Sequence, residues 1–154
     1  MLIFCSYCSS AYSQTKAERQ EIVFALGVAD VFDSNNYTGY GVEYRFRPTW
    51  QTLRPVIGYS STIDHDEYIY VGGRYFFALD ENWQFNPSFG IGLFDKGGDV
   101  DLGGSVEFRS SLEISYRINE HVHIGLELAH LSNSRLYKSN PGTETVSLSI
   151  AIKI

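Results

Sequence analysis

A histidine, a serine and a glutamate near the C-terminus have the residue types and spacing that ester hydrolysis by a serine nucleophile requires. His130 and Ser132 are two residues apart, and Glu144 follows after one intervening loop. A serine hydroxyl attacks a carbonyl carbon only when a neighbouring base takes its proton. The imidazole group titrates near pH 6.5, at about the pH where a general base is needed. A carboxylate that accepts a hydrogen bond from the imidazole orients the ring and stabilises its protonated form.

These three side chains can meet only if paired strands carry them. From Val122 to His130, apolar residues alternate with small or polar ones, and the same period of two runs from Glu144 to Ile154. By this alternation, His130, Ser132 and Glu144 lie on the apolar face. Because one loop joins the two segments, we expect a hairpin in which His130 pairs with Glu144. Their Cβ atoms would then be about 4.5–5.5 Å apart.

Asn133 follows the serine directly and could donate its amide N–H to a developing oxyanion. In other hydrolases, losing one such donor costs about 2.7–4 kcal/mol. Each of these four residues alone is typical of the polar rim of a barrel. Three chemically matched types on one face of one hairpin are less easily explained in that way, and both interpretations stay open at this point.

The rest of the chain repeats the alternating pattern and predicts an all-β fold with eight antiparallel strands. The eight segments span about residues 22–29, 40–46, 53–59, 68–77, 85–93, 106–117, 122–129 and 145–154. One face of each segment is apolar and often aromatic. The other face is small, polar or charged, and its charged members include Arg54 and Lys153 as well as Glu43, Arg45, Arg74, Glu107, Arg109, Glu113, Arg117 and Glu127. Pro55 and Pro87 predict irregular pairing, since each lacks a ladder donor.

Two architectures could use this pattern. A soluble lipid-binding barrel would bury the apolar face, whereas a transmembrane barrel would turn that face to lipid and pair the charges inside. The nearly uncharged apolar face favours the transmembrane barrel, and so do connections that alternate in length. The short ones are expected near 47–52, 78–82 and 118–120, and the long ones near 30–39, 60–67, 95–103 and 131–143.

Composition agrees with a single β-rich domain. The chain has 154 residues with 15% aromatic and 19% charged residues, and its net charge of −6 argues against a nucleic-acid partner. Residues 1–13 contain a short apolar run and small residues before Gln14, a pattern typical of a signal peptide that lacks its charged start. Cys5 and Cys8 both fall in this segment. We therefore expect one barrel domain over residues 14–154.

The sequence His130-Leu131-Ser132-Asn133, followed by Asn140-Pro141-Gly142-Thr143-Glu144, resembles the signature of the outer-membrane lipid A 3-O-deacylase family known as PagL. The resemblance implies an eight-stranded barrel in the bacterial outer membrane, with its active site on the lipid-facing outside near the outer leaflet. It also implies a Ser-His-Glu triad, an oxyanion donor at Asn133, and removal of the 3-O-linked acyl chain of lipid A.

Several expectations accompany this resemblance. No cofactor and no metal is expected, and the partners are lipopolysaccharide and outer-membrane lipid, with a homodimer left open. The chain ends in Ile154 rather than in the aromatic residue common in outer-membrane barrels. A structural or adhesive barrel without catalysis is the alternative function.

Overall fold

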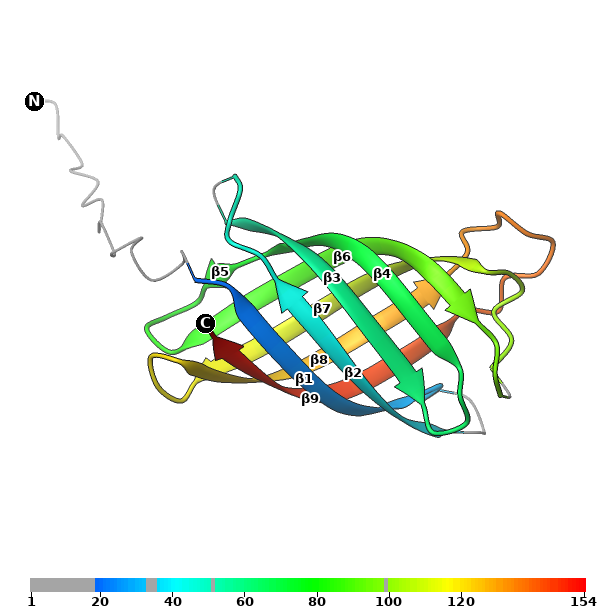
Figure 1. Ribbon diagram of the computed structural model, residues 1–154, viewed down its shortest axis with the longest axis horizontal. Helices are drawn as coiled ribbons and strands as arrows, with labels where there is room; N and C mark the ends of the chain where they lie inside the picture. The colour runs from blue at the N-terminus through cyan, green and yellow to red at the C-terminus, as the bar shows by residue number, and fades with distance from the viewer. Residues whose placement is uncertain (1–18, 33–35, 51, 99) are drawn as a thin grey trace, which may run out of the picture.

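The computed structural model describes residues 19–32, 36–50, 52–98 and 100–154. The expected leader, residues 1–13 with Cys5 and Cys8, lies outside the described residues. The described chain forms a barrel of antiparallel strands (Figure 1). The strands are β1 (Glu21–Ala29), β2 (Tyr37–Arg45), β3 (Leu53–Thr62), β4 (Glu67–Tyr75), β5 (Phe77–Ala78), β6 (Trp83–Asp95), β7 (Val106–Arg117), β8 (Val122–Ser132) and β9 (Thr143–Lys153).

The sheet closes on itself. β1 pairs with both β2 and β9, and β4 pairs with both β3 and β6. β5 continues the line of β4, because Arg74 pairs with Ser88 and Phe77 pairs with Phe85 in the same register. The break in this ladder, at Tyr75 and Phe76, lies opposite Pro87 and Asn86, and Pro87 cannot donate to the ladder. β4 and β5 therefore make one interrupted strand, and the predicted eight-stranded antiparallel barrel is confirmed.

The second proline has a similar effect on its ladder. The pairing of β2 with β3 ends at Arg45 opposite Val56, one residue before Pro55. Pro55 itself keeps its place opposite Gly73 of β4. Both prolines thus end or interrupt a ladder, and neither shifts the register by a bulge.

The outer wall of the barrel is apolar. Large side chains that point outward include Leu26, Leu148 and Phe89, with exposed fractions of 69%, 68% and 60%. Such a wall suits lipid, and a water-soluble barrel would bury it instead. The alternative of a soluble barrel with its apolar face inside is therefore wrong. Among the described residues, no helix is long and apolar enough to cross a membrane.

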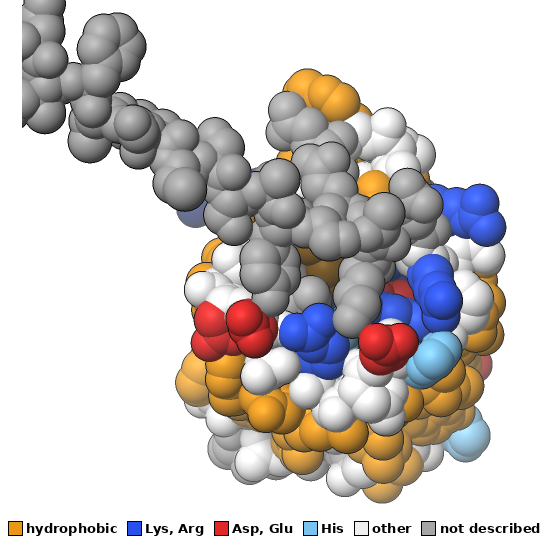
Figure 2. Space-filling view, turned by 90° about the vertical axis from the view of Figure 1, so that its left-hand side faces the viewer, with side chains coloured by type: hydrophobic (Ala, Val, Ile, Leu, Met, Phe, Trp, Pro, Cys, Tyr) orange, Lys and Arg blue, Asp and Glu red, His pale blue; other side chains and the backbone are white. Residues whose placement is uncertain are grey.

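The interior holds a buried cluster of arginines and glutamates, which we call the charge layer. Its members are Glu21, Glu43, Arg45, Arg54, Arg74, Arg109, Glu113 and Glu127. Arg45 forms two hydrogen bonds to Glu113, of 2.7 and 3.2 Å, and Arg74 donates to Glu127 at 2.6 Å. Seen from the end of the barrel that carries the C-terminus, charged side chains of both signs form a band across the end face, and hydrophobic side chains border it below (Figure 2).

Two predicted members do not belong to the charge layer. Arg117 is half-buried and donates to Asn82 at 3.3 Å near the end of β7. Glu107 is fully buried, but neither of its carboxylate oxygens has a hydrogen-bond partner among the described residues. Conversely, Glu21 was not among the predicted interior charges, although its parity within β1 points inward, whereas the alternation had already placed Arg54 on the polar face.

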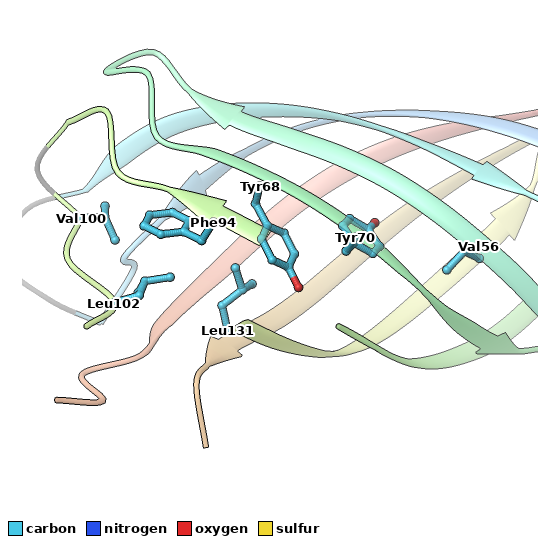
Figure 3. Packing of buried hydrophobic residues seen from close by; sticks show 7 residues of the cluster. All are labelled: Val56, Tyr68, Tyr70, Phe94, Val100, Leu102 and Leu131. Atoms are coloured by element: carbon cyan, nitrogen blue, oxygen red, sulfur yellow. The ribbon is translucent and has the colours of Figure 1, made fainter. Parts of the chain in front are cut away.

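An apolar plug closes the interior at the end opposite the C-terminus. Tyr68, Phe94, Val100, Leu102 and Leu131 gather there, with Tyr70 and Val56 deeper in the barrel (Figure 3). The described residues of the loops 30–36, 63–66, 96–105 and 133–142 lie at this end, and those of the connections 46–52, 79–82 and 118–121 lie at the other (Figure 1). The connection at 63–66 is shorter than predicted, because β3 and β4 extend further than the apolar pattern indicated.

Candidate active site

The predicted hairpin of β8 and β9 carries the candidate site. In the ladder between these strands, His130 pairs with Glu144, which confirms the predicted register. Along β8, Ala129 and Leu131 are buried, whereas His130 and Ser132 lie on the outer face. The period of two therefore places the imidazole and the hydroxyl outside the barrel, in line with the apolar side chains of the wall.

His130 and Glu144 are joined by a hydrogen bond. Imidazole Nδ1 lies 2.9 Å from carboxylate Oε1, and the side chains are 44% and 33% exposed. A carboxylate at Nδ1 favours the tautomer in which Nδ1 carries the proton and Nε2 carries a lone pair. Nε2, the ring nitrogen that a general base would use, is thus available to accept a proton from a neighbouring group on the outer face.

Ser132 is the last residue of β8 and is half-buried. On the β7 side it pairs with Phe108, whose ring stacks on Phe89 at a centroid distance of 6.0 Å. Within the described residues, the Ser132 hydroxyl makes no hydrogen bond. The structure therefore brings His130 and Glu144 together and places Ser132 on the same face, but it does not join the hydroxyl to the imidazole.

Asn133, the residue predicted to donate to an oxyanion, is engaged in hydrogen bonds within the loops. Its backbone N–H already donates to Oδ1 of Asn140 at 2.9 Å. Its side-chain amide, fully buried, donates to the carbonyl oxygens of Leu102 and Ser139, each at 2.8 Å. Asn133 thus ties the loop 96–105 to the loop 133–142. An oxyanion could use its N–H only by displacing Asn140.

The loop after Asn133 has a backbone conformation that sequence reasoning missed. Ser134 and Arg135 both have positive φ, at 51° and 66°. The Asn133 side-chain oxygen accepts from the Arg135 N–H at 3.0 Å, and the Leu136 N–H donates to the Asn133 carbonyl at 2.9 Å. Asparagine is known for such local turns, so the residue type was the available signal.

Gly142 packs directly against the imidazole. Its φ is +73°, and a Cβ added there would lie 3.1 Å from His130 Cε1 and 3.2 Å from the Leu131 carbonyl oxygen. Only glycine takes this backbone conformation freely and leaves this space for the ring. The Pro141-Gly142 pair in the sequence signals a turn, but it does not say which side chain the turn approaches.

The site has no metal-binding character among the described residues, where no group of three or more histidine, cysteine, aspartate or glutamate side chains is arranged to hold an ion. The other two histidines of β8 and its preceding turn lie at the opposite end of the strand from His130. His121 Nε2 lies 3.1 Å from Arg19, and His123 Nε2 lies 3.4 Å from the Lys153 ammonium.

Comparison with solved structures supports the fold. The crystal structure of the outer membrane enzyme PagL matches with a TM-score of 0.69 and 22% identity, over 87% of this chain and 99% of that chain. Neisserial surface protein A matches with a TM-score of 0.64 and 15% identity, over 90% and 97%. A designed transmembrane β-barrel reaches 0.68 with 13% identity, over 89% and 96%. Similarity of fold alone therefore does not distinguish an enzyme.

The sequence itself is more discriminating. No individual curated protein matches it significantly. The family model described as lipid A 3-O-deacylase (PagL), however, matches residues 38–153. This match covers seven of the eight strands of the barrel and the whole hairpin that carries His130, Ser132 and Glu144. The chain belongs to the lipid A 3-O-deacylase (PagL) family.

Proposed function

We propose that this protein is an outer-membrane serine esterase that removes the 3-O-linked acyl chain from lipid A of lipopolysaccharide. The observation that carries the proposal is the hydrogen-bonded His130–Glu144 pair on the outer wall, with Ser132 on the same face two residues away. Family membership supplies the substrate class. The similar outer-membrane structures support the location in that membrane.

The position of the pair argues for a role beyond structure. Polar and ionisable groups on a lipid-facing wall are costly and are commonly functional. The hairpin could carry apolar residues at these positions, as it does at Leu128 and Val146, the next outward pair along the ladder. His130 and Glu144 thus interrupt an otherwise apolar stripe at the end of the barrel where the longer loops lie.

The reaction follows from the residue types. Nε2 of His130 takes the proton of the Ser132 hydroxyl while its oxygen attacks the ester carbonyl carbon. The tetrahedral intermediate collapses, the C–O bond to the sugar breaks, and His130 returns the proton to the departing sugar oxygen. Water, deprotonated by His130, then attacks the acyl-serine and releases the fatty acid. Glu144 orients the imidazole throughout, and the mechanism needs no cofactor.

The orientation in the membrane is part of the proposal. The site lies at the end of the barrel opposite the C-terminus, beside the loops 96–105 and 133–142. With this end outermost, the triad is level with the lipid A headgroups of the outer leaflet. All three residues come from one chain, so a homodimer is compatible with the mechanism and is not needed for it.

The second candidate function is a structural or adhesive barrel without catalysis. One observation favours it, namely that the Ser132 hydroxyl is not hydrogen-bonded to His130 within the described residues. Catalytic hydrogen bonds are often long before substrate binds, which leaves the esterase ahead.

The test is mass spectrometry of lipid A after incubation with the purified protein and with Ser132→Ala. Loss of one hydroxyacyl chain with the wild type only is expected. Ser147→Ala, an inward-facing serine of the same hairpin, is the matched control and should behave as the wild type. Identical spectra from the wild type and Ser132→Ala would refute the esterase.

A further inference from the structure

At the start of β9, a regular ladder of strand pairing is present on one side only, the side of β8. β8 pairs with β9 as far as Leu131 opposite Thr143, so Thr143 and Glu144 are fully paired on that side. On the other side, the ladder between β1 and β9 ends at Ala29 opposite Thr145. Glu144, the group that orients the base, therefore lies just beyond the last regular pair with β1. Strand ends of this kind open most readily.

Two contacts from the residues after β1 replace the missing pairs. The Thr143 hydroxyl donates to Oδ1 of Asp30 at 3.1 Å, and the Val31 N–H donates to the Glu144 carbonyl oxygen at 3.3 Å. Thr143 is 6% exposed, and a buried hydroxyl that loses its partner is unfavourable. These contacts hold the backbone on both sides of the Glu144 carboxylate.

Asp30 reaches Thr143 because it leaves the strand conformation. Its φ is 61°, in the left-handed region that aspartate tolerates better than most residues. Continued alternation along β1 would direct residue 30 outward, whereas Thr143 faces inward. The positive φ breaks the alternation and lets the carboxylate meet the inward-facing hydroxyl.

We propose that Asp30 and Thr143 are positioning residues of the active site, which fix the start of β9 so that Glu144 stays within hydrogen-bond distance of His130. The inference rests on the proposed function and extends the site to Asp30, which follows β1 and lies outside the sequence motif. Neither residue touches the substrate or the reacting atoms.

The barrel offers a matched control for this contact. The Thr62 hydroxyl donates to Oδ2 of Asp66, also at 3.1 Å, and both side chains are buried. This second threonine–aspartate pair closes the connection between β3 and β4, on strands that do not pair with β8 or β9 in the sheet. Thr62→Val therefore makes the same chemical change at the same end of the barrel, away from the site.

The experiment compares Thr143→Val with Thr143→Ser, Asp30→Ala with Asp30→Asn, and both sets with Thr62→Val. Steady-state kinetics on lipid A in mixed micelles give kcat and KM, and the rate of labelling by a fluorophosphonate probe reports activation of Ser132 without lipid A. Thr143→Val and Asp30→Ala should lower kcat about 10- to 100-fold with KM little changed, the loss typical of a small misplacement. Thr143→Ser and Asp30→Asn, which keep the donor and the acceptor, should restore most of the rate.

The outcomes separate the two proposals. Wild-type kcat and labelling in Thr143→Val, or an equal loss in Thr62→Val, would overturn the positioning role while leaving the esterase intact. A wild-type protein that neither hydrolyses lipid A nor reacts with the probe would instead refute the proposed function. Heat-modified migration of each variant on a gel shows that its barrel is folded, so a loss of rate is not a loss of fold.

Discussion

The charge layer inside the barrel and the His130–Glu144 pair outside it use similar groups in opposite ways. Inside, Arg45 and Arg74 each contact more than one glutamate, and their side chains are 3% and 1% exposed. Outside, one imidazole meets one carboxylate, and 44% and 33% of the two side chains are exposed. The interior groups are paired with one another in a network of several ion pairs, whereas the outer pair keeps a ring nitrogen available.

This difference separates structural from chemical use of polar groups in one small barrel. Buried charges are tolerated when they are paired with opposite charges, and removing one partner leaves the other charge buried and unpaired. A polar pair on the lipid face has no such structural role, because an apolar pair at the same positions would contact lipid at a lower cost in free energy. Variants of the outer pair should therefore lose activity, whereas variants of the charge layer should lose stability.

The largest expected effect is on the outer pair. His130→Ala should lower the rate of deacylation by about 10⁴-fold or more, because the base that activates the serine is lost. Its free energy of unfolding should change by less than about 0.5 kcal/mol, as for other exposed positions. Kinetics on lipid A and urea unfolding in micelles measure the two quantities. If His130→Ala were inactive because the barrel unfolds, the outer pair would have a structural role like that of the charge layer, and the contrast between the two would be wrong.

The interior should show the reverse pattern. Arg74→Met removes the partner of Glu43 and Glu127, and breaking a buried ion pair on one side costs about 3–5 kcal/mol. Urea unfolding should reveal the loss, while the folded fraction should keep its kcat. If the stability of the barrel were unaffected, the charge layer would not be the structural element described above.

Glu107 tests the same idea within the interior. This carboxylate is fully buried without a hydrogen-bond partner, unlike Glu113, which accepts from Arg45 and Asn86. Glu107→Gln should therefore leave the unfolding free energy unchanged or raise it by about 1 kcal/mol. Glu113→Gln should lower it. Equal losses in the two variants would show that partnership does not decide the contribution of an interior carboxylate.

The smallest effect is expected at an exposed carboxylate that belongs to neither region. The N–H groups of Asn82 and Trp83 donate to Asp80 at 2.7 and 2.8 Å, and these bonds lower the pKa of Asp80. A lowered pKa stabilises the folded state above the ordinary carboxylate pKa, and this contribution disappears as the pH falls through the lowered value. Asp80→Asn should slightly flatten acid unfolding curves, and a large change would contradict its exposed position.

The period of two was enough to predict the strands, the outward apolar wall and the pairing of His130 with Glu144. Side-chain parity and a single connecting loop leave few registers, and a slip of one residue would bury the imidazole. The interruption of β4 at Tyr75–Phe76 was foreseeable only as irregular pairing at Pro87, since the sequence does not state which ladder the missing donor serves.

The loops set the limit of prediction. The role expected for Asn133 depended on its N–H being free, but Asn140 occupies that N–H and the side chain reaches Leu102 in another loop. Contacts of this kind join loops that are distant in the sequence, and loop residues have no periodic pattern from which such contacts could be predicted. Asp30 was overlooked for the same reason, because its partner Thr143 lies at the far end of the chain.

Every group proposed for the chemical step belongs to one hairpin, whereas the charge layer draws mostly on five other strands, with only Glu127 from β8. Evolution can therefore alter the two independently. A few substitutions between residues 130 and 144 would turn such an enzyme into an inert barrel of unchanged shape, or the reverse. A screen of homologous barrels for hydrolytic ability can therefore begin with this short stretch and then turn to the residue that holds it in place after β1.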